Sequence, residues 1–175
     1  MNKLFFILAT VVFISCEGEK KPQEVTVIKE KYAEPLMRVN KKLIEKDSRD
    51  IENWLKRHEI KAQQTGTGLR FAIVKKGNGN RAKVGQYATI NYRLTLLDGT
   101  FCYDSEKNGP ETFLIGQDHV ESGLHEGIQK MDVGDKCLLI MPPHLAHGLL
   151  GDDKKNPPLS CIVYEVELLQ IKDAQ

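Results

Sequence analysis

The spacing of apolar residues changes across a polar break at residues 64–68, and this change most constrains the fold. Before the break, Leu36, Val39 and Leu43 recur at three and four residues, the period of one helix face. After it, residues 69–74 alternate between two faces, the period of a β-strand. The sequence therefore predicts a helical arm followed by a β-rich domain.

The region after the break contains several strand-like runs and one short run with helical spacing. A strong hairpin signal, Asp98-Gly99, closes the longest run. The helical run covers residues 123–131. Besides 69–74, the predicted strands are 88–97, 112–115, 136–141 and 160–171. We expect an α+β domain over residues 68–172, in which a curved antiparallel sheet wraps on one short helix.

The arm is predicted over residues 35–63. Pro35 suits the first turn of a helix, and Asp47 or Ser48 suits the start of a second one. Two interpretations stay open. The arm is either a helical hairpin that packs on the main domain, or a surface for self-association or partner binding through residues 35–60.

The first residues have the pattern of an export signal. Lys3 precedes an apolar run, 4–14, that is too short to span roughly 30 Å of hydrocarbon. Ser15 and Cys16 end the run, and a small residue directly before Cys resembles the lipidation signal of bacterial lipoproteins. We expect a signal peptide over 1–16, a lipid on Cys16 and a polar tether over 17–34. The alternative is an ordinary secretory signal with a chance cysteine.

Composition excludes one class of partner and leaves another question open. The formal net charge is +1, so nothing favours nucleic-acid binding. Of the four cysteines, Cys102, Cys137 and Cys161 lie outside the signal. This odd number excludes a complete disulfide framework. The redox state of the three thiols stays open.

A series of short motifs in the β-rich region resembles the FKBP-type peptidyl-prolyl cis-trans isomerases. In chain order they are Val84-Gly85-Gln86, Thr89-Ile90-Asn91-Tyr92, Leu97-Asp98-Gly99, Tyr103-Asp104-Ser105, Phe113-Leu114-Ile115-Gly116, Gly123-Leu124-His125-Glu126-Gly127, Met131-Asp132-Val133-Gly134, Pro143-His144-Leu145-Ala146-His147-Gly148, Asn156-Pro157-Pro158 and Val163-Tyr164-Glu165-Val166-Glu167-Leu168-Leu169. The resemblance implies rotation about X-Pro peptide bonds in an apolar pocket. It implies no covalent catalysis, metal or other cofactor.

The resemblance also assigns site residues by position. The catalytic pocket would comprise Tyr92, Tyr103, Asp104, Val120, Glu121, Leu124, His147 and Tyr164. Further substrate contacts would come from Phe113, Glu111, Lys155 and Asn156. The segment between Asp98 and Asp104 has one residue more than the short form of the family, which predicts a β-bulge.

Several positions depart from the family pattern. Tyr103 and Leu124 stand where Phe and Trp are usual, and His147 replaces a Tyr that donates to the ligand. Glu111 stands at an aromatic position of the rim. Glu121 stands at an apolar position whose backbone N–H binds the substrate carbonyl, a contact that any residue except proline preserves. We expect a retained inner pocket with a more polar rim.

The leading functional hypothesis is an isomerase that assists folding of exported, proline-containing polypeptides. It would be lipid-anchored in the cell envelope, on the periplasmic face or the outer-membrane surface. The alternative is a catalytically weak binding or chaperone module of the same fold. A more distant alternative is a metal site. It would use His144 and His147 with neighbouring groups, namely Asp118, His119, His125, Asp152 and Asp153.

Overall fold

The computed structural model describes the backbone of residues 23–174 and the side chains of residues 33–174. The predicted signal peptide and the lipidation residue Cys16 lie outside this range. The chain divides into one unit that ends at Val39 and a second from Asn40 to Gln175. Within the described range, no helix has an apolar stretch long enough to cross a membrane.

Seven antiparallel strands of the second unit form one sheet in the order β1-β2-β6-β7-β3-β4, and β5 also pairs with β3. The five predicted strands are confirmed, and two short strands, β1 and β4, are additional. The strands are β1 Gln63–Gln64, β2 Arg70–Lys75, β3 Gln86–Leu96, β4 Phe101–Asp104, β5 Glu111–Leu114, β6 Lys136–Met141 and β7 Ile162–Asp173. The helices are α1 Gln23–Arg57, α2 Ser105–Asn108, α3 Ser122–Ile128 and the 3-10 helix η1 Pro143–Leu145.

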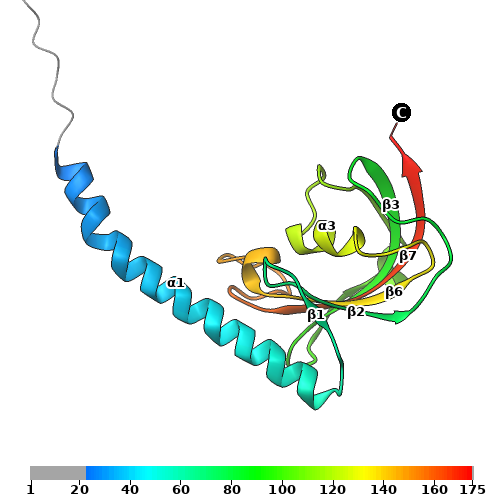
Figure 1. Cartoon of the computed structure of the whole chain (residues 1–175), viewed down its shortest axis with the longest axis horizontal. Helices are drawn as coiled ribbons and strands as arrows, with labels where there is room; N and C mark the ends of the chain where they lie inside the picture. Colours follow the sequence, from blue (N-terminus) through cyan, green and yellow to red (C-terminus); the bar gives the residue numbers. More distant parts are fainter. Residues whose placement is uncertain (1–22, 175) are drawn as a thin grey trace, which may run out of the picture. The chain divides into compact units, whose positions relative to one another are not determined.

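The sheet is curved, and α3 lies in its hollow (Figure 1). We call the face toward α3 the inner face. Alternate residues of the long strands point to it and form the main core with Leu124 and Ile128 of α3. The inner residues of β3 and β7 include Ile90, Leu94 and Tyr164. The predicted α+β class, with a sheet wrapped on a short helix, is confirmed.

The bulge predicted between Asp98 and Asp104 is also confirmed. Leu94 pairs with Tyr103, whereas the next residue, Thr95, pairs with Phe101. Cys102 is therefore the extra residue on β4, and its side chain is fully buried. A bulge increases local twist, so this one helps to aim Tyr103 toward the inner face.

The outer face of the sheet carries a second apolar cluster, made with the end of α1. Ile51, Trp54 and Leu55 are buried there and pack with Leu138, Ile140, Cys161 and Val163 of the sheet side. This part of the arm packs on the β domain, as the first interpretation predicted. Burying apolar side chains of this size stabilises by about 1.5–3 kcal/mol each.

The prediction of two helices was wrong, because α1 runs unbroken from Gln23 to Arg57. It begins inside the predicted tether and contains Pro35 in its interior. Ser48 does not cap a helix; its hydroxyl accepts from Arg70 Nη2 at 2.7 Å. Arg70 is 3% exposed, and its Nε donates to Glu52 Oε1 at 3.0 Å. Ser48 thus lies inside α1 and contacts β2 instead of starting a second helix.

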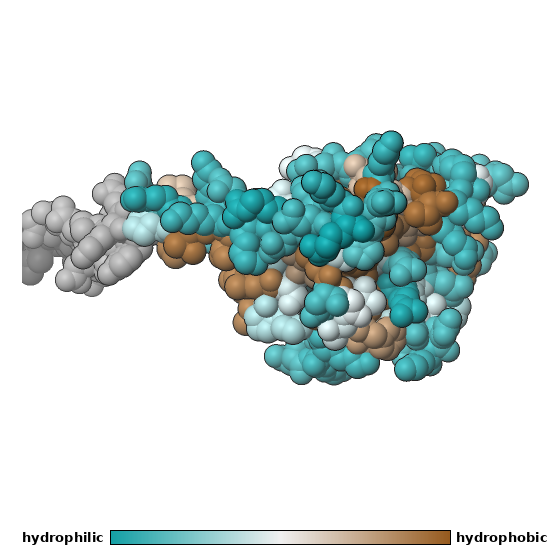
Figure 2. Space-filling model, turned by 90° about the horizontal axis from the view of Figure 1, so that it is seen from below, coloured by the Kyte–Doolittle hydropathy of each residue, from teal (hydrophilic) through white to brown (hydrophobic). Residues whose placement is uncertain are grey.

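The described side chains of the first unit leave apolar residues uncovered. Leu36, Met37 and Val39 are each more than half exposed, and so is Ile44 in the second unit. Figure 2 shows hydrophobic surface on the part of α1 next to the grey atoms. The charged pair Glu34 and Arg38, 3.6 Å apart, is also exposed. The described part of this stretch is therefore an amphipathic helix whose apolar side chains are exposed.

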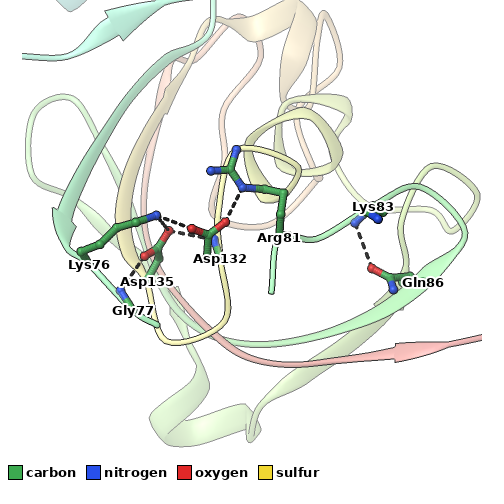
Figure 3. A network of polar contacts seen from close by, with 7 residues as sticks. All are labelled: Lys76, Gly77, Arg81, Lys83, Gln86, Asp132 and Asp135. Carbon is green, nitrogen blue, oxygen red and sulfur yellow. Dashed lines mark hydrogen bonds and ion pairs between the residues drawn. The ribbon is translucent and has the colours of Figure 1, made fainter. Parts of the chain in front are cut away.

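A polar network joins the loop after β2 to the turn before β6 (Figure 3). Asp135 is fully buried and accepts from the backbone N–H of Gly77 at 2.6 Å and of Asp132 at 2.7 Å. Lys76 Nζ lies 2.5 Å from Asp132 and 3.2 Å from Asp135, and Arg81 pairs with Asp132. Burial by itself raises the pKa of Asp135, but its hydrogen bonds outweigh burial and hold the pKa below its ordinary value.

Candidate functional site

Three elements bring aromatic and apolar side chains together on the inner face. Tyr92 comes from β3, Tyr164 from β7 and Leu124 from α3. The rings of Tyr92 and Tyr164 are tilted by 53° with centroids 5.7 Å apart. Leu124 is fully buried, and Val120 is partly buried against the same core. The structure therefore places these four predicted pocket residues in one apolar region.

Glu121 introduces a polar network into this apolar region. The Tyr164 hydroxyl donates to Glu121 Oε1 at 3.1 Å. His147 Nε2 lies 3.1 Å from the same oxygen, at ion-pair distance but without hydrogen-bond alignment. The side chains of Glu121 and His147 are 11% and 26% exposed. Three predicted pocket residues, Glu121, His147 and Tyr164, thus meet at the Glu121 carboxylate.

The pKa values in this network reflect the pairing. Pairing with Glu121 raises the pKa of His147, and the opposing effect of burial is smaller. Burial raises the pKa of Glu121, but the His147 contact, its own backbone N–H and Tyr164 together bring it below the ordinary value. Burial and then the charge of Glu121 raise the pKa of Tyr164 well above its ordinary value. Each of these two groups thus favours the charged form of the other.

The backbone of Glu121 starts helix α3. Its carbonyl accepts from the N–H groups of Leu124 and His125, at 2.9 and 3.1 Å, in the first turn of α3. No carbonyl in the described part of the chain, residues 23–174, accepts from the backbone N–H of Glu121. This N–H instead contacts the carboxylate of its own residue, and that contact lowers the Glu121 pKa.

Tyr103 is attached to the loop between β6 and β7. Its hydroxyl donates to Asp152 Oδ2 at 2.6 Å, and this hydrogen bond raises the pKa of Tyr103 to about 12. Asp152 Oδ1 also accepts from the backbone N–H groups of Lys154, Lys155 and Asn156, each at 2.9 Å. These contacts outweigh burial and hold the pKa of Asp152 well below its ordinary value. Sequence reasoning had placed Asp152 only among the metal alternatives, although an Asp that precedes such N–H groups is a typical turn signal.

The two predicted loop contacts, Lys155 and Asn156, hold this loop in place. Asn156 is buried, and its amide donates to Asp152 Oδ2 at 2.8 Å. Lys155 Nζ donates to the Cys102 carbonyl at 2.6 Å and lies 5.1 Å from the ring centroid of Tyr103. This geometry is that of a cation–π contact. Both side chains therefore bind their own protein in this structure.

Asp104 is not joined to the Glu121 network by any contact among residues 33–174. It is the N-cap of α2, where Oδ1 accepts from the backbone N–H of Lys107 at 3.0 Å. The last residue of α2, Asn108, has its amide 3.5 Å from the Tyr92 hydroxyl. Asp104 is thus linked to Tyr92 only indirectly: it caps α2, and Asn108 of α2 contacts the Tyr92 hydroxyl.

Strand β5 presents Glu111 and Phe113 to the inner face. Phe113 pairs with Ala88 of β3, is 2% exposed and packs edge-on against the His125 ring at 5.6 Å. Glu111 is two residues earlier and partly buried. Burial, and then the charge of Glu121, raise the pKa of Glu111. Phe113 is a core residue in this structure, and Glu111 lies nearer to the rim.

A groove of about 1130 Å³ lies on the opposite, outer face of the sheet. It runs between the end of α1 at Trp54, Arg57 and His58 and the charged outer residues of β3 and β7. The groove also touches Tyr92 and Asp104 from their outer side. Its lining does not include Glu121, His147 or Tyr164. It is therefore separate from the apolar region around Tyr164 and Leu124 on the inner face, which we call the inner pocket.

The histidines proposed for a metal site make other contacts. His144 Nε2 lies 2.9 Å from the Thr67 carbonyl, and His147 pairs with Glu121. His125 Nδ1 accepts from the Gly116 N–H, and its Nε2 donates to the Asp118 carbonyl, both at 2.9 Å. Within residues 33–174, no three potential metal ligands gather at one point.

Comparison with known proteins decides the family. The family model of the FKBP-type peptidyl-prolyl cis-trans isomerases matches residues 78–169. The chain belongs to this family. The FK506-binding protein 1 of Dictyostelium discoideum, a relative of FKBP type, is 37% identical over 106 residues, which cover 60% of this chain and 99% of that protein.

A second FKBP-type relative extends the match toward the arm. The FKBP-type peptidyl-prolyl cis-trans isomerase FkpA of Escherichia coli is 35% identical over 137 residues, which are 75% of this chain and 50% of FkpA. The crystal structure of E. coli FkpA matches with a TM-score of 0.65 and 30% identity, over 91% of this chain and 76% of that one. By sequence, the chain spans about half the length of FkpA.

The family sets the activity. As an FKBP-type isomerase, the chain is an enzyme that rotates X-Pro peptide bonds, as its motifs predicted. The family match runs from Asn78 in the loop before β3 to Leu169 in β7, so it covers the inner pocket. It does not include α1, so the arm is an addition to the FKBP-type domain.

Proposed function

We propose that catalysis takes place in the inner pocket between Tyr92, Tyr164 and Leu124. The observation that carries this proposal is that β3, β7 and α3 bring these side chains into one apolar region, with the Glu121 backbone N–H beside it. The N–H would hold the substrate carbonyl while the prolyl side rotates. Rotation must overcome about 18–20 kcal/mol, because the planar amide has partial double-bond character.

The apolar walls would supply the rest of the acceleration. A planar amide is more polar than a twisted one, so an apolar pocket favours the twisted form. Val120 and Tyr103 would form the walls, with shape complementary to that form. His147 would donate to the ligand in place of the usual tyrosine, since an imidazole N–H can donate. No proton transfer or covalent step is needed.

The remaining predicted residues would act at the rim or through neighbours. Glu111 would contact the substrate directly. Lys155 and Asn156 would act by holding the loop that carries Asp152, as their hydrogen bonds support. Asp104 would act through α2 and Tyr92. Phe113 would support the pocket by packing in the core next to it, because its side chain is buried.

A protease-free assay on short X-Pro peptides tests the site. The protein from residue 17 onward should accelerate isomerisation, and Tyr92→Ala should remove most of that rate. Glu165→Gln is the matched control, because Glu165 lies exposed on the outer face of β7. If Tyr92→Ala and the control behave alike, the inner pocket is not the catalytic site. No acceleration by the parent protein would favour the binding-module alternative.

The clients would be exported proteins with proline-limited folding. Proline isomerisation takes tens to hundreds of seconds unaided, which is slow enough to limit folding. Residues 1–16 would direct export, a lipid on Cys16 would anchor the protein to an envelope membrane, and the segment after it would be a tether. Labelling with a radioactive fatty acid tests this anchor. Loss of label in Cys16→Ser supports the anchor, and an unlabelled parent protein contradicts it.

The arm over residues 35–60 would mediate self-association. The exposed side chains of Leu36, Met37, Val39 and Ile44 support this proposal, because an uncovered apolar stripe on a helix suits a second copy of the same helix. Light scattering on the eluting protein should give the mass of a dimer. Val39→Lys should shift it to a monomer, whereas Lys41→Ala on the same helix should not. A monomeric parent protein would contradict the proposal.

A further inference from the structure

Glu111 has no charged partner although it is partly buried. Its register fixes its direction. Glu111 pairs with Ile90, which is fully buried in the inner core, and paired residues point to the same face of a sheet. Its neighbour Thr112 pairs with Thr89, and their hydroxyls lie 2.9 Å apart. The Glu111 carboxylate therefore points to the inner face, on the side of the pocket.

Two basic side chains near the pocket, His147 and Lys155, already have partners in the protein. His147 is paired with Glu121, and Lys155 Nζ is held by the Cys102 carbonyl. Among the described side chains, residues 33–174, no Lys, Arg or His lies at ion-pair distance from Glu111. Burial and the nearby charge of Glu121 both raise its pKa, and no cation lowers it. The inner face thus carries a carboxyl group whose negative charge, when it ionises, no described side chain neutralises.

The charge of Glu111 reaches the floor of the pocket. Both Glu121 and Glu111 raise the pKa of the Tyr164 hydroxyl. Because Glu121 is compensated by His147, Glu111 is the carboxylate left for a ligand. A peptide cation beside the reacting proline would recover the free energy that partial burial of Glu111 costs.

We propose that Glu111 determines substrate specificity by selecting X-Pro segments with Lys or Arg next to the proline. This inference rests on the proposed catalytic role of the inner pocket. An aromatic residue at this position, as the family usually has, gives no such charge selection. The effect is electrostatic, so it should weaken with salt, because the Debye length falls from about 10 Å at 0.1 M to about 3 Å at 1 M.

Two peptide series test the proposal, one varied before proline and one after it, each with Lys, Leu or Glu at the varied position. In at least one series, kcat/KM for the Lys peptide should exceed that for the Glu peptide by about tenfold at low salt, which corresponds to about 1.4 kcal/mol. Glu111→Gln should reduce the ratio to about two, and Glu111→Lys should invert it. Glu165→Gln, the same change on the outer face, should leave the ratio as it was.

The outcomes separate the two proposals. Equal rates for all charges, or a Lys-to-Glu ratio that Glu111→Gln leaves unchanged, would overturn the selectivity. A clear Leu rate together with either result would leave the catalytic site intact. If no peptide is isomerised, the catalytic proposal fails, and NMR binding of the Lys and Glu peptides then decides the selectivity alone. Equal affinities would overturn it, and a preference for Lys that is lost in Glu111→Gln would support it.

Discussion

The Tyr103 hydroxyl donates a 2.6 Å hydrogen bond to Asp152 Oδ2 and joins strand β4 to the loop between β6 and β7. That loop also carries His147, whose ring lies at the pocket. The hydrogen bond therefore connects a wall residue to the segment that positions a second pocket residue. Asp152 serves as the centre of the connection, because it accepts from three backbone N–H groups as well.

Removing Asp152 should return the Tyr103 hydroxyl to an ordinary titration. The hydrogen bond raises the pKa of Tyr103 to about 12, so Tyr103 should ionise after the other exposed phenols. Its stabilising contribution is fully present below the unfolded pKa of about 10 and is lost as pH rises through about 12. Tyr164 also ionises late, so the number of late-ionising tyrosines is what is compared. In Asp152→Ala, absorbance at 295 nm should show one more tyrosine ionising near pH 10, and Tyr103→Phe should have one late-ionising tyrosine fewer. The same number of late-ionising tyrosines in Asp152→Ala as in the parent protein would contradict this assignment.

Glu121→Gln should lower the pKa of His147. In the parent protein, pairing with the carboxylate raises this pKa, so the stabilising effect is present below about 6.5 and is lost as pH rises through the higher folded value. NMR titration of the imidazole measures the change directly. Glu165→Gln, far from the imidazole on the outer face, is the control. An unchanged His147 titration in Glu121→Gln would show that the pair at 3.1 Å is not formed in solution.

The network at Asp135 should control stability in acid. Lys76 and Arg81 hold the pKa of Asp132 at about 2, and hydrogen bonds lower the pKa of Asp135. Both groups therefore contribute stability above about pH 4, and the contribution is lost as pH falls through the folded values. The thermal midpoint should fall between pH 5 and pH 2.5. Asp135→Asn should flatten this dependence and destabilise by about 2–3 kcal/mol at pH 7.

The exposed residue Asp153 offers a matched change for that experiment. Asp153→Asn should leave both the midpoint and its pH dependence as in the parent protein. An equal loss in both variants would show that overall charge, and not the buried network, governs acid stability.

Gly77→Ala should be costly although Gly77 lies in a loop. A Cβ there would lie 2.3 Å from the Val133 carbonyl oxygen and 2.5 Å from the Gly134 carbonyl carbon, and these backbone atoms cannot move aside freely. We expect a loss of about 2–3 kcal/mol in urea unfolding. Gly66→Ala is the control, because nothing lies within 4 Å of its Cβ position. Equal stability of the two variants would contradict the close approach of the two loops.

Ile51→Ala should destabilise the β domain although Ile51 lies on α1. Ile51 is fully buried against the outer face, so its truncation should cost about 2–5 kcal/mol of unfolding free energy. Val39→Ala on the same helix should change the stability of the β domain by less than about 0.5 kcal/mol, since Val39 is 54% exposed. Chemical unfolding followed by Trp54 fluorescence compares them. A small effect of Ile51→Ala would mean that the end of α1 does not pack on the sheet.

Local sequence patterns predicted most of the strands but misplaced the arm. Alternation in β2 and helical spacing in α3 depend only on residues that are close in sequence, so the sequence alone predicts them. Ser48 has the local character of a helix cap, yet its hydroxyl accepts from Arg70. A cap signal is worth about 1 kcal/mol, and a tertiary contact of similar strength is enough to override it.

For the candidate site too, the sequence predicted some features, and others needed the tertiary structure. Motifs found the family and located Tyr92, Leu124 and Tyr164 by position. They assigned Lys155 and Asn156 to the substrate, whereas in this structure Lys155 binds the Cys102 carbonyl of β4 and Asn156 binds Asp152 of its own loop. Asp152 was missed as the centre of that loop, because its partner Tyr103 is far away in sequence.

The sequence by itself therefore determined three things: the strands of the β-rich domain, the bulge before Asp104 and membership of the FKBP-type isomerases. Only the tertiary structure decided how Glu121, His147 and Tyr164 meet, how Tyr103 holds Asp152, and that Glu111 is left without a cation. Periodicity reports the average environment of a segment, whereas a hydrogen bond or a charge pair depends on atoms that folding brings together from distant segments. That dependence is why the sequence predicted the fold more completely than the chemistry of the pocket.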